Sequence, residues 1–304
     1  MPRADNVVKV QHLGPATENE GVAVSEVHVG SEPEVAPAVP VIATRGITKH
    51  FGTVQALRGV DLDVYAGEVV GLVGDNGAGK STLVNILSGA LQPNDGSILV
   101  DGKTVTFSSS LEARRAGIET VYQDLSLAPD LSVWANIFLG REQSVKGPLG
   151  WFHWLDRKAM AQAAEADLER TRIRIGSVGS LAGRLSGGQR QAIAVGRAVA
   201  WGSRVILMDE PTAALGVEQQ AKVGELMRSV CDQGVPILLI SHNLPQIHAL
   251  CDRVVVLFQG RVVTDLRPAD CSVEEIVSWI TGASLAATAA TVSQLSRSGG
   301  QHGA

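Results

Sequence analysis

The segment GDNGAGKST at residues 74–82 constrains the fold of this chain more than any other stretch. It fits the pattern G-x-x-x-x-G-K-[ST] without a mismatch, and in that pattern the backbone N–H groups of a glycine-rich turn surround phosphate groups. The apolar run EVVGLVG precedes the turn, and apolar residues at helical spacing follow it from Leu83 to Leu91, before Pro93. A strand, turn and helix in this order favour a phosphate-binding loop over an ordinary glycine-rich turn, so we predict an α/β fold.

The side chains of this loop have separate predicted roles. Lys80 would reach the terminal phosphates of a nucleotide, and the Ser81 hydroxyl would contact Mg²⁺. Phe51 lies before an alternating segment and could stack on an adenine base, although core packing is the alternative. The loop residues expected to bind the nucleotide are Gly74, Asn76, Gly77, Ala78, Gly79, Lys80, Ser81 and Thr82.

Two further apolar runs end in polar residues that can perform chemistry. The runs RVILM at 204–208 and VPILLIS at 235–241 are typical of parallel strands covered on both faces. Asp209 and Glu210 follow the first run and His242 follows the second, which places them at the carboxyl edge of the sheet, where α/β proteins bind ligands. On an extended strand end the two acids would point in different directions, Asp209 toward Mg²⁺ and Glu210 toward an attacking water. The alternatives are acids at a helix N-terminus and a packed or surface histidine.

A second glycine-rich turn, LSGGQRQ at residues 185–191, lacks a lysine. A serine and two glycines that open a helix form an anion-binding turn, because N–H groups at a helix N-terminus carry partial positive charge. Its candidate contact residues are Ser186, Gly187, Gly188 and Gln189. Gln123, in VYQDLSL, ends a predicted strand; it is either a surface amide or a Mg²⁺ ligand that senses the γ-phosphate.

The chain of 304 residues divides into three predicted parts. Residues 1–41 contain five prolines among glutamates and small residues, and residues 283–304 are also rich in small polar residues, so both are predicted to be disordered. Residues 42–282 form one α/β unit, with antiparallel strands near its N-terminal edge. This unit contains a mostly helical insertion at about 111–184, in which Asp156 is predicted to cap a helix.

Composition and charge exclude several functional classes. The formal net charge is −5 and no long basic run offsets it, so nucleic acid is not an expected partner. No apolar stretch approaches the roughly 18 residues that span a bilayer, and any membrane role must depend on a partner.

The three cysteines, at positions 231, 251 and 271, are interpreted as reduced thiols. The aromatic cluster WFHW at 151–154 is core packing or a partner surface, and packing is favoured.

In chain order, these motifs resemble those of the ATP-binding cassette (ABC) ATPases. GDNGAGKST, Gln123, LSGGQRQ, VILMDEP and ISHN are similar to the phosphate loop, glutamine loop, signature, second acidic motif and switch histidine of that family. The resemblance implies a P-loop cassette with a mostly parallel core sheet, an N-terminal antiparallel β subdomain and an inserted helical subdomain. It implies ATP and Mg²⁺ as cofactors, with Lys80, Gln123, Glu210 and His242 in catalysis and Ser81, Gln123 and Asp209 at the metal. Because two cassettes face each other head to tail in that family, the signature would serve the partner's ATP.

Three longer segments resemble the cassettes that energise import of simple sugars in bacteria, namely VYQDLSLAPDLSVWANIFLGRE, DEPTAALGVEQ and DQGVPILLISHN. Many relatives in that branch fuse two cassettes, whereas this chain has one phosphate loop and is expected to form a homodimer. Gly216 stands where ABC ATPases usually have aspartate. The implied partners are a second cassette, integral-membrane permease subunits and, indirectly, a solute-binding protein, at the cytoplasmic face of the inner membrane. The alternative is a non-transport ABC module acting on chromosomes or ribosomes, which the lack of a long coiled-coil insertion disfavours.

Overall fold

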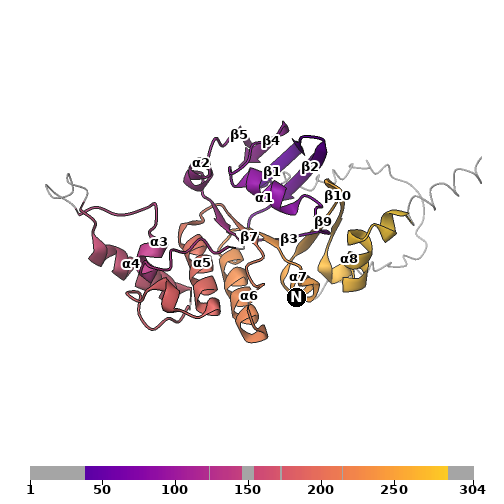
Figure 1. Cartoon of the computed structure of the whole chain (residues 1–304). Coiled ribbons are helices and arrows are strands. Elements are labelled where there is room, and N and C mark those ends of the chain that lie inside the picture. The colour runs from indigo at the N-terminus through magenta and orange to yellow at the C-terminus, as the bar shows by residue number, and fades with distance from the viewer. Residues whose placement is uncertain (1–37, 123, 146–153, 172, 214, 287–304) are drawn as a thin grey trace, which may run out of the picture. The chain divides into compact units, whose positions relative to one another are not determined.

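In the computed structural model, which describes residues 38–286 except 123, 146–153, 172 and 214, a six-stranded sheet forms the centre of the fold (Figure 1). The strand order is β10-β9-β3-β8-β7-β6, and only β10 runs antiparallel to its neighbour. The bounds are β3 (Val69–Val73), β6 (Ile118–Val121), β7 (Val205–Asp209), β8 (Ile237–Ile240), β9 (Arg253–Phe258) and β10 (Arg261–Leu266). The three apolar runs predicted as buried strands are β3, β7 and β8, and they pair in parallel, which confirms that prediction.

The N-terminal part of the described chain forms a second, four-stranded antiparallel sheet. Its order is β2-β1-β4-β5, with β1 (Ile42–Phe51), β2 (Val54–Val64), β4 (Asp95–Val100) and β5 (Lys103–Val105). Asp101 and Gly102 connect β4 to β5 with φ angles of 48° and 74°. Two successive positive φ angles match the right-handed twist of the hairpin, which is why an Asp-Gly pair stands there. The predicted antiparallel strands are confirmed.

Two apolar cores lie on opposite faces of the six-stranded sheet. On one face, α1 (Lys80–Leu87) buries Leu83, Ile86 and Leu87 against side chains of both sheets. On the other face, helices pack directly on the strands, as Figure 1 shows, and these are α5 (Gly187–Trp201), α6 (Val217–Cys231), α7 (Leu244–Leu250) and α8 (Val273–Ile280). Because side chains alternate along a strand, Leu72 of β3 belongs to the first core and Val73 to the second.

Helix α1 ends earlier than its apolar pattern predicts. The pattern extends to Leu91, but α1 ends at Leu87 and Gly89 follows with φ of 70°. A Cβ at Gly89 would lie 2.7 Å from the carbonyl oxygen of Ser109, so only glycine fits this tight crossing. Close packing of the chain therefore ends the helix before Pro93.

Among its described residues, the region predicted as a mostly helical insertion is less helical than expected. Between residues 111 and 184 the chain forms α2 (Ser110–Arg115), strand β6, α3 (Val133–Ile137), α4 (Arg157–Arg170) and the 3-10 turn η2 (Ala182–Arg184). Asp156 caps α4 as predicted, since its carboxylate accepts a hydrogen bond from the N–H of Ala159 at 3.0 Å. Trp154 is 64% exposed, so the packing predicted for the aromatic cluster is wrong for this residue, and residues 151–153 lie outside the described part.

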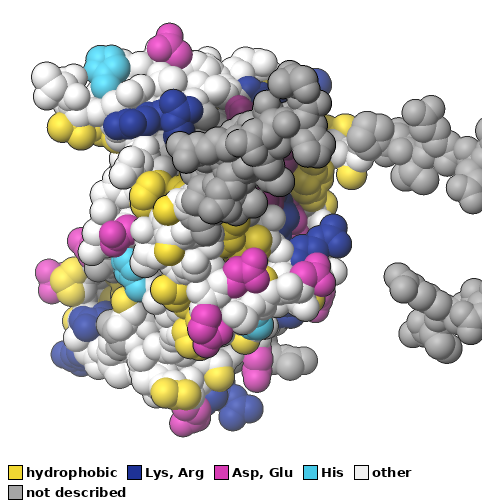
Figure 2. Space-filling model, turned by 90° about the vertical axis from the view of Figure 1, so that its right-hand side faces the viewer, with side chains coloured by type: hydrophobic (Ala, Val, Ile, Leu, Met, Phe, Trp, Pro, Cys, Tyr) yellow, Lys and Arg dark blue, Asp and Glu magenta, His cyan; other side chains and the backbone are white. Residues whose placement is uncertain are grey.

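The two ends of the chain, 1–37 and 287–304, lie outside the described residues, and the disorder predicted for them stays a prediction. Residues 283–286, the start of the predicted tail, form a helical turn. None of the helices in the described part is long and apolar enough to cross a membrane. On the face shown in Figure 2, basic and acidic side chains are interspersed, so the described residues present no continuous basic surface there.

Candidate nucleotide-binding and hydrolysis site

The predicted phosphate loop connects the carboxyl end of β3 to the start of α1. Gly74, Gly77 and Gly79 have φ angles of 153°, 80° and 110°, a backbone conformation that side chains strongly disfavour. A Cβ at Gly74 would overlap the carbonyl oxygen of Leu257, and one at Gly79 would lie 2.7 Å from that of Ala56. A Cβ at Gly77 would meet nothing within 4 Å. The loop is thus closely packed on the protein side and open at Gly77, which fits a cradle for phosphate oxygens.

Lys80 lies over this loop with only 7% of its surface exposed. Its Nζ donates hydrogen bonds to the carbonyl oxygens of Gly74 at 2.7 Å and Asp75 at 3.0 Å. Burial lowers the pKa of Lys80, and the nearby carboxylates of Glu210, Asp209 and Asp75 partly offset this. The ammonium group is therefore held at the loop, in the place where it can bind phosphate oxygens.

Asp209 is the last residue of β7 and stands beside the loop, as predicted from the end of the apolar run. Burial raises the pKa of Asp209, whereas a hydrogen bond with the Ser81 side chain and the charges of Lys80 and His242 lower it. The contact with Ser81 brings a carboxylate and a hydroxyl oxygen together. Oxygen ligands of this kind suit Mg²⁺, so these two residues fit the predicted metal site.

Glu210 departs from the strand geometry that its position suggests. Its φ is 52°, in the left-handed region, so the expectation that it continues an extended strand end is wrong. Its N–H still donates to the carbonyl oxygen of Ile240 at 2.9 Å, which anchors the residue to β8. The turn directs the Glu210 carboxylate toward His242, and the two groups lie 3.3 Å apart between Oε1 and Nε2.

The Glu210 carboxylate carries an unsatisfied oxygen. Oε1 is buried and, at its distance from His242, has no hydrogen bond of acceptable geometry. Burial raises the pKa of Glu210. The charge of His242 and a hydrogen bond from the backbone N–H of His242 partly offset this rise. A buried carboxylate oxygen without a partner is costly, and a water at this position would satisfy it. The arrangement fits a group that polarises an attacking water.

His242 follows β8, and the structure confirms its predicted place at the same sheet edge as Asp209 and Glu210. Its side chain is 61% exposed, so the packed-core alternative is wrong. The next residue, Asn243, caps α7 by accepting a hydrogen bond from the N–H of Gln246 at 3.2 Å. The histidine thus precedes a capped helix start, yet its own ring remains accessible.

The signature motif forms the N-terminus of α5. Ser186 is the N-cap, and its hydroxyl accepts from the N–H of Gln189 at 3.2 Å while the Gln189 side chain accepts from the N–H of Ser186 at 3.1 Å. This reciprocal capping box occupies the Gln189 side chain, and a Cβ at Gly187 would meet nothing within 4 Å. Among the described residues, no hydrogen bond or ion pair connects this motif to the loop at 74–82. Ser186 and Gly187 are exposed and Gly188 is half-buried, so the start of the motif is accessible to a second chain.

Two predicted residues have other outcomes. Phe51 ends β1 and precedes β2, which contains the alternating segment, as predicted; its side chain is 50% exposed, so the core alternative is wrong. The Nζ of Lys49 lies 5.5 Å from the centre of its ring. An exposed ring at a strand end is free to stack on a base. Gln123 lies outside the described residues, so its predicted role stays a prediction.

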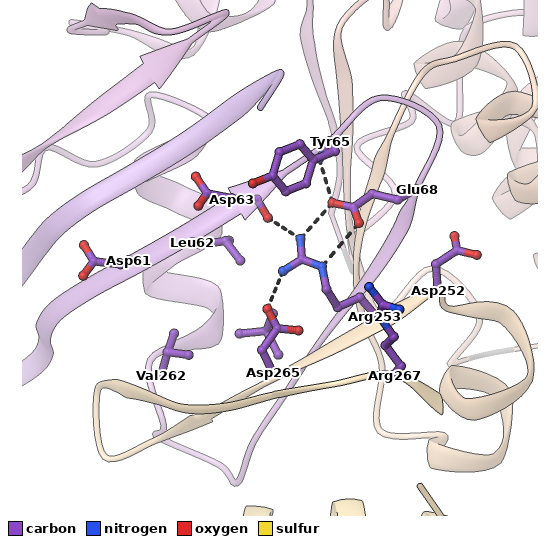
Figure 3. Close-up of a pocket in the computed structure, with 11 residues that line it drawn as sticks. Asp61, Leu62, Asp63, Tyr65, Glu68, Asp252, Arg253, Val262, Asp265 and Arg267 are labelled. Carbon is purple, nitrogen blue, oxygen red and sulfur yellow. Dashed lines mark hydrogen bonds and ion pairs between the residues drawn. The ribbon is translucent and has the colours of Figure 1, made fainter. Parts of the chain in front are cut away.

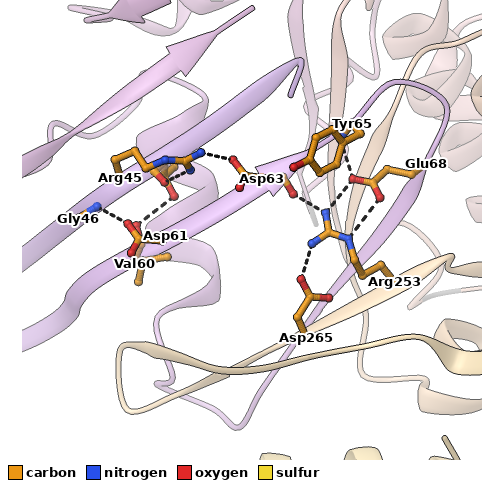
Figure 4. A network of polar contacts seen from close by, with 10 residues as sticks. Arg45, Gly46, Val60, Asp61, Asp63, Tyr65, Glu68, Arg253 and Asp265 are labelled. Carbon is orange, nitrogen blue, oxygen red and sulfur yellow. Dashed lines mark hydrogen bonds and ion pairs between the residues drawn. The ribbon is translucent and has the colours of Figure 1, made fainter. Parts of the chain in front are cut away.

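Sequence reasoning missed a polar pocket of about 650 Å³ at the opposite, amino-terminal edge of the core sheet (Figure 3). Arg253 of β9 lies at its centre and contacts Glu68, Asp265 and the carbonyl oxygen of Asp63, a network that Figure 4 extends to Arg45. These residues come from β1, β2, β9, β10 and the turn before β3. No short sequence pattern unites them, so no local signal could have identified the pocket.

Comparison with known proteins agrees with this geometry. The family described as ABC transporter matches residues 57–213. The chain is 47% identical over 246 residues to a fructose import ATP-binding protein, FrcA, of Rhizobium meliloti, covering 80% of this chain and 95% of the relative. It is 44% identical over 245 residues to a xylose/arabinose import ATP-binding protein, XylG, of Sulfolobus acidocaldarius, covering 81% and 95%.

A longer relative and a solved structure extend the comparison. A ribose import ATP-binding protein, RbsA 1, of Rubrobacter xylanophilus is 42% identical over 246 residues, which cover 81% of this chain but 48% of that relative. The ADP conformation of MJ1267, an ATP-binding cassette of an ABC transporter, superposes with a TM-score of 0.66 at 28% identity, covering 79% of this chain and 94% of that one. The chain therefore belongs to the ABC transporter family, as an ATPase cassette with the α/β fold of that family.

Proposed function

We propose that this chain hydrolyses ATP to power import of a simple sugar by an ABC transporter. ATP hydrolysis is supported by the sheet edge where β3, β7 and β8 end. This edge brings together Lys80, Asp209, Glu210 and His242 around an unsatisfied carboxylate oxygen of Glu210. The sugar is inferred from the names of the similar proteins, which import fructose, xylose, arabinose or ribose.

The side chains divide the work of hydrolysis between binding and chemistry. Lys80 and the backbone N–H groups of the loop bind the phosphates, and Ser81 and Asp209 would hold Mg²⁺. When bound, Mg²⁺ supplies positive charge that offsets the charge developing on the phosphates. Glu210 accepts a hydrogen bond from the attacking water and orients it, and the exposed His242 ring lies beside the Glu210 carboxylate, with Nε2 3.3 Å from Oε1.

The partner of this chain is a second copy of itself. The exposed N-terminus of α5, with Ser186, Gly187 and Gly188, offers backbone N–H groups to the γ-phosphate bound at the other copy's Lys80. Permease subunits and, through them, a solute-binding protein complete the transporter, and the chain acts at the cytoplasmic face of the cell membrane. This arrangement accounts for a glycine-rich turn that carries no lysine.

Glu210→Gln tests the assignment of the hydrolytic group. Glutamine keeps the shape of glutamate but cannot carry its charge, so purified full-length protein should lose ATPase turnover by a factor of roughly 100 or more while still binding Mg-ATP. In cells lacking the chromosomal gene, wild-type protein should restore uptake of one labelled sugar among fructose, ribose and xylose, and Glu210→Gln should not. If Glu210→Gln turns over ATP at the wild-type rate, the group that activates the water lies elsewhere. If deleting the gene leaves the uptake of all three sugars unchanged, the proposed role in sugar transport is contradicted.

A mixing experiment tests the shared site. Ser186→Arg spoils the signature and Lys80→Ala spoils the phosphate loop, so each homodimer should be inactive. A heterodimer of the two retains one intact composite site, and the mixture should recover ATPase activity. Absence of recovery, with heterodimers demonstrated by differently tagged chains, would contradict a site shared between two copies.

A further inference from the structure

Neutral amide side chains connect two loops at the carboxyl edge of the core sheet. Gln220, in the first turn of α6, donates from Nε2 to the carbonyl oxygen of Leu215 at 3.0 Å and to that of Thr212 at 3.3 Å. Its Oε1 accepts a hydrogen bond from Nδ2 of Asn243 at 3.1 Å. Both ends of the Gln220 amide are therefore used, one for each loop.

A second bridge runs parallel to the first. The hydroxyl of Thr212, a residue only 2% exposed, donates to Oε1 of Gln246 at 2.9 Å. Asn243 accepts from the N–H of Gln246 with its Oδ1, which leaves its Nδ2 to point at Gln220. Partly buried hydrogen bonds that satisfy one another in this way fix side-chain orientation more firmly than isolated pairs.

The two connected loops carry the hydrolytic groups. Thr212 lies two residues after Glu210, and Asn243 directly follows His242. Glu210 is held at φ of 52°, a strained conformation for a residue with a side chain, which persists only where the surroundings enforce it. His242 is largely exposed, so packing does not fix its ring. The 3.3 Å separation between Glu210 and His242 therefore depends on how the loops after them are held.

Gly216 at the end of the first loop removes one means of holding it. It is the N-cap of α6, and it has no side chain with which to accept a hydrogen bond from the helix or to reach another loop. Gln220 lies one turn further along α6 and makes the connections described above. The helix itself thus supplies the contacts through a side chain in its first turn.

We propose that Gln220 is a positioning residue for ATP hydrolysis, which fixes the loop after Glu210 against the loop after His242 and keeps the two catalytic groups aligned. This inference rests on the proposed ATPase function. The hydrogen bonds of Gln220 go to Thr212, Leu215 and Asn243, none of which belongs to the phosphate loop. The contribution of Gln220 accordingly falls on the chemical step and not on nucleotide binding.

Gln220→Met keeps the length of the side chain and removes all three hydrogen bonds. In the purified full chain, kcat for ATP should fall about tenfold or more, because small displacements of reacting groups are costly. KM and the affinity for ATP should stay within about twofold of the wild type. The matched control is Gln233→Met, which removes an exposed amide hydrogen bond to the Ser229 carbonyl oxygen, 2.9 Å long, near the other end of α6 and should keep wild-type kcat.

An ion pair that replaces the two amides provides the rescue. Asn243→Asp retains the cap on α7 but places an acceptor against Oε1 of Gln220, so kcat should fall. Adding Gln220→Lys supplies an ammonium group that donates both to the carboxylate introduced at position 243 and to the Thr212 and Leu215 carbonyl oxygens, and kcat should rise above that of the single variant.

The outcomes separate the two proposals. Wild-type protein without ATPase activity would contradict the proposed function itself. Active wild-type protein together with unchanged kcat in Gln220→Met, or a double variant no better than Asn243→Asp, would overturn the positioning role alone. A fall in kcat accompanied by an equal loss of ATP affinity would also overturn it, because it would indicate a general loss of structure.

Discussion

Arg253→Met should destabilise the fold without slowing ATP hydrolysis. The Arg253 guanidinium donates to Glu68 at 2.8 Å, to Asp265 at 2.5 Å and to the carbonyl oxygen of Asp63, and it lies 5.9 Å from the centre of the Tyr65 ring (Figure 4). Only 17% of its side chain is exposed. Because its partners lie on β2, on β10 and just before β3, this one side chain ties the antiparallel sheet to the core sheet.

The loss in the free energy of unfolding depends on how well water can solvate the carboxylates that lose the Arg253 cation. Removing one partner of a buried ion pair costs about 3–5 kcal/mol. Asp265 is 44% exposed and can be hydrated instead, whereas Glu68 is 16% exposed and would keep only its hydrogen bond from the Tyr65 N–H. The expected loss in the free energy of unfolding is therefore about 2–4 kcal/mol, which lowers the midpoint of thermal unfolding by about 4–15 °C in a domain of this size.

Urea unfolding of the full chain, followed by circular dichroism, measures this loss. Arg253→Lys restores the charge but not the planar fork that donates to Glu68 and Asp265 together, and it should recover less than half of the stability. The kcat for ATP, measured well below the unfolding midpoint, should match the wild type because the pocket lies at the sheet edge opposite the phosphate loop. A loss below about 1 kcal/mol in Arg253→Met would refute the reasoning, since that is the value of an exposed pair.

Two further results are expected from the packing of glycines and thiols. Gly74→Ala should lower the free energy of unfolding in urea by about 2–5 kcal/mol, because its Cβ would overlap the Leu257 carbonyl oxygen. Gly77→Ala should lower it by only about 1–2 kcal/mol and should weaken ATP binding in a nucleotide titration. Equal losses in the two variants would contradict the packing of the loop. Burial raises the pKa of Cys231 to about 12 and raises that of Cys251 as well, so at pH 8 both groups are thiols rather than reactive thiolates. Alkylation of native protein at pH 8, followed by mass spectrometry, should therefore label the partly exposed Cys271 first, and labelling of Cys231 should accelerate as pH rises toward 12; fast labelling of Cys231 at pH 8 would contradict its burial.

Local sequence patterns were sufficient for the elements that carry chemistry. The phosphate loop could be predicted because an apolar strand, a glycine-rich turn and a helix are contiguous, and each is determined by a few neighbouring residues. Asp209 and His242 could be assigned to one sheet edge because each ends a continuous apolar run, and parallel strands bring such ends together. The same reasoning was wrong where packing overrides a pattern, as at Gly89, which ends α1 because the chain crosses Ser109 closely.

Contiguous segments therefore encode the fold class, the family resemblance and the residues available for hydrolysis, and these could be predicted before folding was considered. The left-handed turn at Glu210, the amide contacts of Gln220 and the network around Arg253 emerged only from the folded chain. The turn at Glu210 is anchored to Ile240 of a neighbouring strand, the Gln220 amide reaches Asn243 as well as two carbonyl oxygens close by in the chain, and the contact between Glu68 and Arg253 spans 185 residues. Such contacts exist only after the strands have paired and the helices have packed, and no local pattern encodes them.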